Sequence, residues 1–407
     1  MKLLELQLHD NIKELEMENN SNKEQSALAL TATLPDPTNA EIELEKLDSN
    51  VPLMDKPFDP TMIKIDTKTP SLDTLIERIE LKEVELETES YFQRNPDLWD
   101  DTKKSRLIES ILIQFPLPAF YFDGTDNRKW LVVDGLQRLS SIRSFVVDKT
   151  LKLTNLEFLT TLNGKGYDDL GRDLQRIIKN AQVVVYIILP GTPTDVKYNI
   201  FKRINTGGLI LVPQEIRHAL FQGAPANFIA QLALTPSFVN ATGRSIKTER
   251  MLDRDFANRF LAFYYLGYDS YQPDLDTYMS KAMAAVHTMS EDQKDEIKNA
   301  YDRSMQLNID IFGKHAFRKF ENINDGRSPI NKALFDVFSV SFAKLTEGEM
   351  TLIKDRKDKF IEDFINLLYH DVDNTFFWAV TSSTSDKYRV QYRYQKVQEL
   401  ITSTINS

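Results

Sequence analysis

Five consecutive residues, Asp134, Gly135, Leu136, Gln137 and Arg138, have the types and order that a phosphate-binding turn needs. They join an apolar run, WLVVD, to an amphipathic one, LQRLSSIR, so we expect a strand, a glycine turn and a helix start. Backbone N–H groups at a helix start lack intrahelical acceptors and, together with the helix dipole, attract anions. Glycine lets a ligand approach the backbone closely. The pattern therefore predicts an anion site.

The side chains of this turn could add to the chemistry. Arg138 offers a planar, permanently charged fork that matches phosphate geometry. Asp134 could hold Mg²⁺, which prefers oxygen ligands and phosphate, and Gln137 could orient a water molecule. A purely structural interpretation is equally compatible with the spacing: Asp134 would cap the helix and Arg138 would form a surface ion pair.

A second set of polar residues ends a predicted helix in the run FKRINTGG. Arg203 is a candidate anion ligand here, with Asn205, Gly207 and Gly208 in the turn that follows. Simple helix termination also accounts for these residues, because cations favour a helix C-terminus and Asn and Gly favour the C-cap. Their functional interpretation therefore needs more than local chemistry.

Three further runs mix aromatic or basic residues. YFQRN contains Arg94 and precedes Trp99, and a packed surface loop explains it as well as a binding loop does. The charged run from Arg244 to Arg259 is typical of a solvated helix face. The C-terminal YRVQYRYQKVQEL could stack on single-stranded nucleic acid, but its helical spacing favours packing.

The elements that must position these residues alternate between strand and helix patterns in the first part of the chain. Leu72, Leu75, Ile76 and Ile79 predict a helix capped by Ser71. A second helix follows from an apolar stripe that runs to Phe115. Strands AFYFD and WLVVD come next, joined by GTDNRK, which predicts a hairpin with Asp123-Gly124 at its entry. A helix through Val146 and a buried strand QVVVYIIL follow. Short helices after GTPT and at PQEIRHALFQG complete this part.

From about Pro225 onward the pattern is helical throughout. We therefore predict the α+β class, with three regions: an acidic, largely disordered tail (1–64), a mixed domain (65–225) and an all-helical domain (226–407). In the tail, the stretch from Glu18 to Asn50 is too polar to order itself, and a short amphipathic helix is expected before it.

Composition excludes several classes of function. The chain has no cysteine, which removes disulfides, thiolate nucleophiles and cysteine-ligated zinc. Its five histidines are far apart, so an HNH nuclease module finds no support. Residues 1–50 hold a net charge of −7 out of −10, which leaves a nearly neutral body without a broad field for nucleic acid. Neither a secretory signal nor a membrane-spanning stretch is apparent, so a cytoplasmic protein is expected.

Four of these runs occur in a familiar order: YFQRN with Trp99, SRLIESILIQFPLPAFYF, WLVVDGLQRLSSI and FKRINTGGLILVPQEIRHAL. Together they resemble the N-terminal domain family of the GmrSD-type restriction endonucleases over about residues 70–225. The resemblance implies a ParB/sulfiredoxin-like fold in which a glycine turn ending in Arg binds nucleotide phosphates. It also implies a nucleotide-dependent role in restriction or anti-phage defence.

Carried onto this chain, the resemblance makes Asp134, Gly135, Gln137 and Arg138 the nucleotide motif, with Leu136 contributing its backbone. Arg94, and Arg203 with Asn205 of the FKRINTGG run, would complete the pocket. Two departures matter. Leu136 stands where the family often has Gln, which favours nucleotide binding over hydrolysis, and no HNH module is found. Sulfiredoxin chemistry is excluded because it needs a cysteine.

Three hypotheses follow. The first is an NTP-binding, NTP-hydrolysing regulatory protein of a restriction system that uses Mg²⁺, with a separate nuclease or effector as partner and with oligomerisation left open. The second is a DNA-binding or DNA-nicking module that grips a backbone phosphate with the same turn. The third is a non-enzymatic scaffold that holds a partner.

Overall fold

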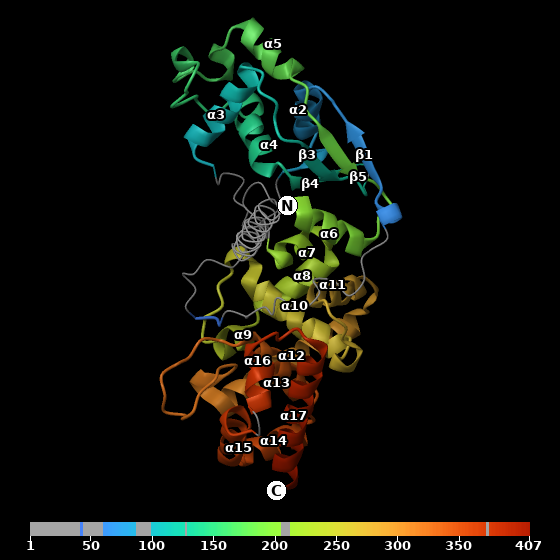
Figure 1. Cartoon of the computed structure of the whole chain (residues 1–407), viewed down its shortest axis with the longest axis vertical. Coiled ribbons are helices and arrows are strands. Elements are labelled where there is room, and N and C mark those ends of the chain that lie inside the picture. Colours follow the sequence, from blue (N-terminus) through green and yellow to red (C-terminus); the bar gives the residue numbers. More distant parts are fainter. Residues whose placement is uncertain (1–40, 44–59, 87–98, 127, 205–211, 372–373) are drawn as a thin grey trace, which may run out of the picture.

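The computed structural model describes residues 41–43, 60–86, 99–126, 128–204, 212–371 and 374–407. The molecule is elongated, with a sheet-containing part at one end and a helical part at the other (Figure 1). We call the described residues between 60 and 220 the mixed half, and those from 221 to 407 the helical half. The predicted α+β class is confirmed; the ParB/sulfiredoxin likeness and the domain limits stay predictions.

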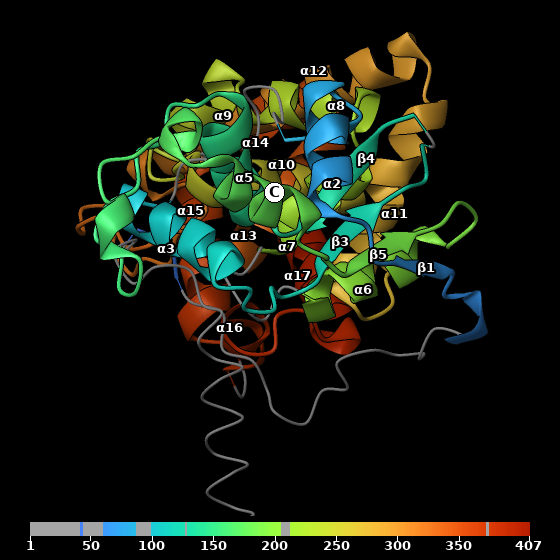
Figure 2. The same cartoon turned by 90° about the horizontal axis from the view of Figure 1, so that it is seen from above.

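The mixed half is built on a five-stranded sheet with the strand order β1-β5-β3-β4-β2. The strands are β1 (Ile65–Lys68), β2 (Val84–Glu85), β3 (Phe120–Asp123), β4 (Trp130–Asp134) and β5 (Val185–Ile188). β3 pairs antiparallel with β4, as predicted, and parallel with β5. The pairs β1–β5 and β2–β4 are antiparallel and parallel, respectively. β1 therefore forms one edge of the sheet (Figure 2).

One face of the sheet is covered by the helices α2 (Leu72–Glu80), α3 (Asp101–Leu112), α4 (Leu136–Ile142) and α5 (Arg172–Asn180), with a π-helical turn, η2 (Arg143–Val147), continuing α4. The predicted stripe of α2 is buried, and Ser71 occupies the N-cap with extended backbone but without a side-chain cap. Phe120 and Phe122 point into this core from β3.

The apolar stripe of α3 was predicted to include Phe115, and this was wrong. The helix ends at Leu112, Gln114 takes a φ of 62°, and the Phe115 side chain is left 59% exposed. Gln114, with its left-handed backbone, turns the chain away from the helix axis before Phe115. The buried stripe therefore ends at Leu112, one turn before Phe115.

The opposite face of the sheet is covered by α6 (Thr194–Ile204), which leads to α7 (Pro213–Leu220). Val133 and Ile188 of the sheet form a small apolar cluster with Val196, Ile200 and Phe201 of α6. The alternation of strand side chains between two apolar cores explains why the interior strands β3 and β5 have nearly continuous apolar sequences.

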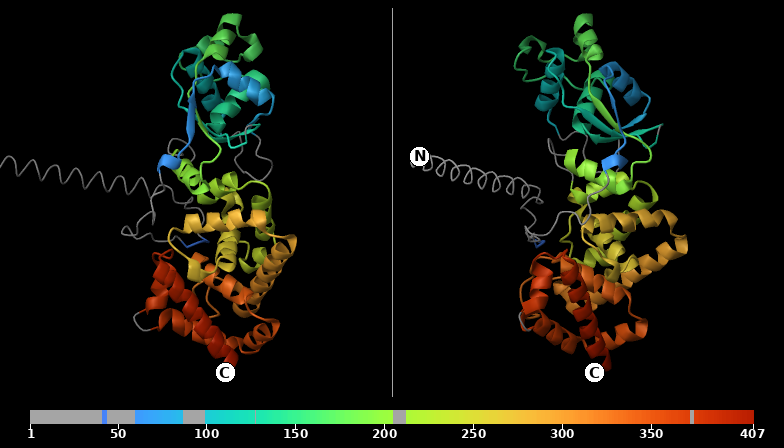
Figure 3. Two further views of the ribbon diagram at one scale, coloured as in Figure 1. Left: turned by 90° about the vertical axis from the view of Figure 1, so that its right-hand side faces the viewer. Right: turned by 45° about the vertical axis from the view of Figure 1, so that its right-hand side comes forward.

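The helical half contains ten α-helices in its described residues, as the helical pattern predicted. They are α8 (Ala224–Ala233), α9 (Pro236–Ala241), α10 (Leu252–Tyr265), α11 (Leu275–Ala285), α12 (Glu291–Phe312), α13 (Lys332–Ala343), α14 (Glu347–Asp355), α15 (Lys357–Tyr369), α16 (Thr375–Thr381) and α17 (Lys387–Asn406). α13 is buried all round from Ala333 to Ala343 and lies against α10, α12, α16 and α17. Two further views show the two halves stacked along the long axis (Figure 3).

Two charged runs have different outcomes. The run from Arg244 to Arg259 was predicted to be a solvated helix face, which is wrong for its C-terminal part: Asp253 and Arg259 are 5% and 3% exposed. The packing prediction for the C-terminal run is confirmed at Tyr394, which is buried. Tyr388 is exposed instead and stacks on Tyr392. Periodicity locates a helix but does not tell which charged positions its neighbours will cover.

Candidate functional site

The predicted turn lies where β4 ends and α4 begins. Gly135 occupies the N-cap of α4 with φ 102° and ψ 8°, a conformation that residues with a Cβ atom rarely adopt. A Cβ atom at this position would also lie 2.5 Å from Cδ1 of Phe120 and 3.3 Å from Nη2 of Arg138. Both the backbone conformation and the space therefore require glycine here.

This turn presents backbone N–H groups at the start of α4. Leu139 N–H donates to the Gly135 carbonyl, as the first intrahelical bond does, and Gly135 supplies no side-chain cap. The N–H groups of Leu136, Gln137 and Arg138 come before that bond, so the helix itself offers them no acceptor. The Leu136 side chain is buried in the core, so only its backbone faces the turn.

Arg138 points its guanidinium back into the mixed half. It donates to the carbonyls of Pro118 and Ala119 and to Oδ2 of Asp134 at 2.9 Å, and it lies over the Phe120 ring at 4.5 Å. Burial lowers the pKa of Arg138, and the Asp134 carboxylate acts in the opposite direction. Arg138 therefore fastens the segment before β3 to the end of β4. Its direct contact with a phosphate stays a prediction.

A tyrosine that the sequence analysis did not single out lies beside Asp134, and a second one stacks on it. Tyr121 is the register partner of Asp134 across β3 and β4, and its ring stacks on that of Tyr186 at 4.9 Å. Burial, Tyr186 and Asp134 together raise the pKa of Tyr121. The available signal was the Phe-Tyr-Phe alternation of β3, which sends Tyr121 to the face opposite Phe120 and Phe122.

Gln137 links the turn to the chain that carries the YFQRN run. Its Oε1 atom accepts the N–H of Trp99 at 3.3 Å. Arg94 lies outside the described residues, but the described chain resumes at Trp99, five positions later, directly beside the turn. The structure therefore places Trp99, the described end of the first sequence run, at Gln137.

The FKRINTGG run begins in the last turn of α6, which ends at Ile204 on the other face of the sheet. Arg203 is exposed near the end of this helix, and Ile204, its last residue, belongs to the same apolar cluster as Tyr121 and Val133. Asn205, Gly207 and Gly208 lie outside the described residues. The structure thus brings Asp134, Gly135, Leu136, Gln137 and Arg138 together, and it places Arg203 on a neighbouring helix.

A buried ion pair that sequence reasoning missed ties α6 to the β3–β4 turn. Lys197 Nζ lies 2.9 Å from Oδ2 and 3.2 Å from Oδ1 of Asp123, and it also donates to the Thr125 hydroxyl. Both charged side chains are about nine-tenths buried. The Asp123-Gly124 pair had been assigned only a hairpin turn, and no local spacing links Asp123 to a lysine 74 positions away.

PQEIRHAL, the end of the run that begins with FKRINTGG, forms α7 and connects the two halves. Arg217 of α7 is 1% exposed, and its guanidinium lies 2.8 Å from Asp276 of α11 and 2.9 Å from Asp255 of α10. Its Nε atom donates to Gln214 at 2.8 Å. The buried guanidinium group of Arg217, bound to two carboxylates, fixes α7 against the helical half. The segment next to the candidate site therefore leads directly into the joint between the halves.

His218, next to Arg217, gives the joint a pH-dependent stability. Burial, with a contribution from Arg254, lowers the pKa of His218 from 6.5 to about 4. Between these values the unfolded chain binds the extra proton and the folded chain does not, so stability falls as the pH falls from about 6.5 to 4, by up to about 3 kcal/mol. We expect His218→Gln to flatten this slope in urea unfolding measured between pH 7 and 4.5. Equal slopes for the two proteins would contradict the prediction.

Metal binding was predicted for Asp134 alone. Among the described residues no group of three or more His, Asp or Glu side chains could hold a metal ion by itself. Mg²⁺ is commonly held by one or two carboxylates together with substrate phosphates, so a single, partly exposed Asp134 is compatible with a phosphate-bound Mg²⁺. None of the described helices is long and apolar enough to span a membrane.

The fold and the site define a class: an α+β protein whose glycine turn sits at the end of a central strand, with a helical half joined to it. Residues 74–222 match the family model of the GmrSD restriction endonuclease, N-terminal domain. Residues 74–222 therefore carry a domain of this family, which covers most of the mixed half, as the sequence runs predicted, and this domain indicates a role in a restriction system. No curated protein and no solved structure gives a significant match.

Proposed function

We propose that this chain is a nucleotide-binding regulatory component of a restriction system, and that the turn from Asp134 to Arg138 holds the phosphates of a nucleoside triphosphate. The observation that carries the proposal is Gly135, whose left-handed backbone starts α4 and whose missing Cβ atom leaves room for the Phe120 ring, so that three helix-start N–H groups without intrahelical acceptors lie at the turn. Such groups bind phosphate through hydrogen bonds and the helix dipole.

The surroundings of the turn support the same function. Arg138 holds the turn in place through Pro118, Ala119 and Asp134, so the N–H groups are positioned before a ligand arrives. Trp99, bonded to Gln137, would bring the segment with Arg94 to the site. Arg203, Asn205, Gly207 and Gly208 would close the pocket from the α6 side, and the ring of Tyr121, stacked on that of Tyr186, offers a surface next to Asp134.

Hydrolysis is the second part of the proposal. Mg²⁺, when bound, would neutralise phosphate charge, and Asp134 would hold it through its carboxylate. Gln137 would orient the attacking water, and its Oε1 atom would then accept from both the water and Trp99 N–H. The turn needs no such second partner to bind phosphate. Binding is therefore the part of the proposal with the larger structural support.

Thermal unfolding in the presence of each of the four common NTPs with Mg²⁺ tests the proposal. A nucleotide that binds only the folded chain stabilises it by about 2.7 kcal/mol at a hundred times its Kd, which raises Tm by several degrees. We expect at least one NTP to produce this rise. If none does while a short DNA duplex shifts in a gel with strong salt dependence, the turn grips a DNA phosphate instead.

A further inference from the structure

The described residues 41–43 lie apart from the mixed half, although they precede it in the chain. In Figure 1 this short blue segment lies beside the helical half, whereas β1 lies in the sheet-containing half. Ile42 forms a parallel bridge with Ile330, in the segment that leads to α13. Two backbone bonds make the bridge: Glu43 N–H donates to the Ile330 carbonyl at 2.8 Å, and Ile330 N–H donates to the Glu41 carbonyl at 2.7 Å.

The side chains on both sides of Ile42 are acidic, and each meets a basic partner. Glu43 Oε1 lies 2.7 Å from Lys319 Nζ, and Glu41 Oε2 lies 3.2 Å from Arg327 Nη2. Arg327 is itself held by the Gly243 carbonyl and by the Ser245 hydroxyl. The two cations are therefore set at a fixed spacing that matches two glutamates separated by one residue.

A buried amide completes the contact. Asn331 is 4% exposed, and its Nδ2 donates to Glu43 Oε2 at 3.0 Å and to the Val380 carbonyl, while its Oδ1 caps α13 at Leu334 N–H. Ile42 packs against the main apolar core of the helical half. Backbone pairing, an apolar anchor and three polar side chains are the elements with which proteins recognise an extended peptide.

We propose that Lys319, Arg327, Asn331 and the backbone of Ile330 form a recognition site for an extended Glu-aliphatic-Glu segment, and that the chain fills it with its own residues 41–43. The contact fixes residues 41–43 to the helical half, and the described chain resumes at residue 60, before β1 in the mixed half. The helical half is then contacted by two separate segments, α7 and residues 41–43. The inference does not depend on nucleotide binding.

Hydrogen exchange at single amides tests this site in the full chain. The Ile330 amide should be protected because it donates to Glu41, and Glu43→Lys should raise its exchange rate by at least about tenfold. The backbone N–H of Asn331 donates to the Phe317 carbonyl, within the helical half. Its protection should therefore not change, which would show that the fold is intact. Lys319→Glu added to Glu43→Lys should restore the protection of Ile330.

Glu321→Lys, the same charge change at an exposed position of the neighbouring loop, is the matched control and should leave the Ile330 amide protected. Three results would overturn the proposal. The Ile330 amide could exchange at the unprotected rate in the wild type, it could stay protected in Glu43→Lys, or its protection could rise with protein concentration. The last result would assign the segment to a second copy of the chain, because docking within one chain is independent of concentration.

Discussion

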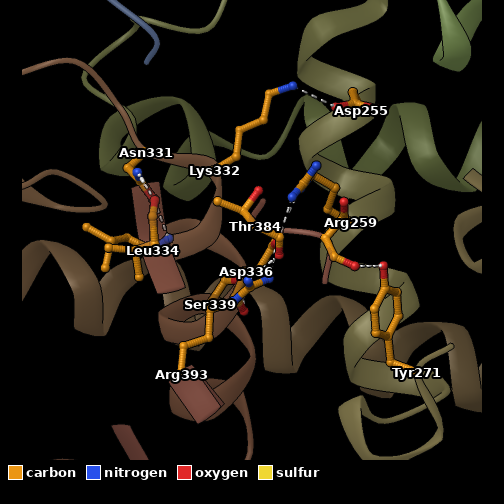
Figure 4. Close-up of polar contacts among 12 residues, drawn as sticks. Asp255, Arg259, Tyr271, Asn331, Lys332, Leu334, Asp336, Ser339, Thr384 and Arg393 are labelled. Carbon is orange, nitrogen blue, oxygen red and sulfur yellow. Dashed lines mark hydrogen bonds and ion pairs between the residues drawn. The ribbon is translucent and has the colours of Figure 1, made fainter. Parts of the chain in front are cut away.

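Asp336→Ala should lower the free energy of unfolding by about 3–5 kcal/mol, because it leaves two buried guanidinium groups without their shared counter-charge. Asp336 is fully buried and accepts from Arg259 Nε at 2.8 Å and Nη2 at 2.7 Å, and from Arg393 Nη2 at 3.3 Å (Figure 4). Burial lowers the pKa of Arg393, and Arg259 adds to this effect. Urea unfolding followed by circular dichroism measures the loss.

The control for this prediction is an ion pair of the same chemistry at the surface. Glu347 lies 2.8 Å from Arg303, with side chains that are 76% and 41% exposed, so Glu347→Ala should cost less than about 1 kcal/mol. The two carboxylates differ in burial and in the number of guanidinium groups that each one binds. A similar cost for both variants would show that the Asp336 cluster is solvated in the folded protein.

Gly135→Ala should be the second most harmful change, at about 2–4 kcal/mol. An alanine must adopt φ near 102° and place its Cβ atom within 2.5 Å of the Phe120 ring, so backbone strain and overpacking add. Relief of this strain and overpacking should displace the backbone of the turn, which moves the N–H groups of α4 and weakens nucleotide binding. Thermal and urea unfolding measure the first effect.

Gly164→Ala separates the effect of backbone strain from that of overpacking. Gly164 also has a positive φ, of 82°, but a Cβ atom added there meets nothing within 4 Å, so only the strain of about 1–2 kcal/mol should remain. If both variants lose equal stability, the close contact between Gly135 and Phe120 does not constrain the turn.

The order and type of most elements were predictable because they depend on local periodicity. The stripe of α2, the β3–β4 hairpin and the buried strand β5 all follow from residues within one element. The sheet order was not predictable, since β1 pairs with β5 across more than a hundred residues. The burial of Arg259 was missed for the same reason: its partner, Asp336, lies 77 positions away.

The candidate site shows the same division. The glycine turn was predictable because strand, Gly and helix are adjacent in the chain, and the resemblance to the family is supported by the match over 74–222. The direction of the Arg138 side chain was not, because it is set by carbonyls some 20 residues earlier. The roles of Arg94, Asn205, Gly207 and Gly208 stay predictions, and so does the participation of Arg203.

Calorimetric titration of wild type, Gln137→Glu and Gln293→Glu with the Mg²⁺–NTP that stabilises the chain tests the phosphate site most directly. Gln137→Glu keeps the oxygen that accepts Trp99 N–H and puts a negative charge at the start of α4, where helices tolerate it. Gln293 accepts Ser290 N–H at the start of α12 in the same way, so it is the matched control. At about 4 Å the added charge repels a phosphate by roughly 1–4 kcal/mol, so Kd should rise roughly tenfold or more for Gln137→Glu and stay unchanged for Gln293→Glu. An unchanged Kd for Gln137→Glu would show that the turn does not hold the phosphates.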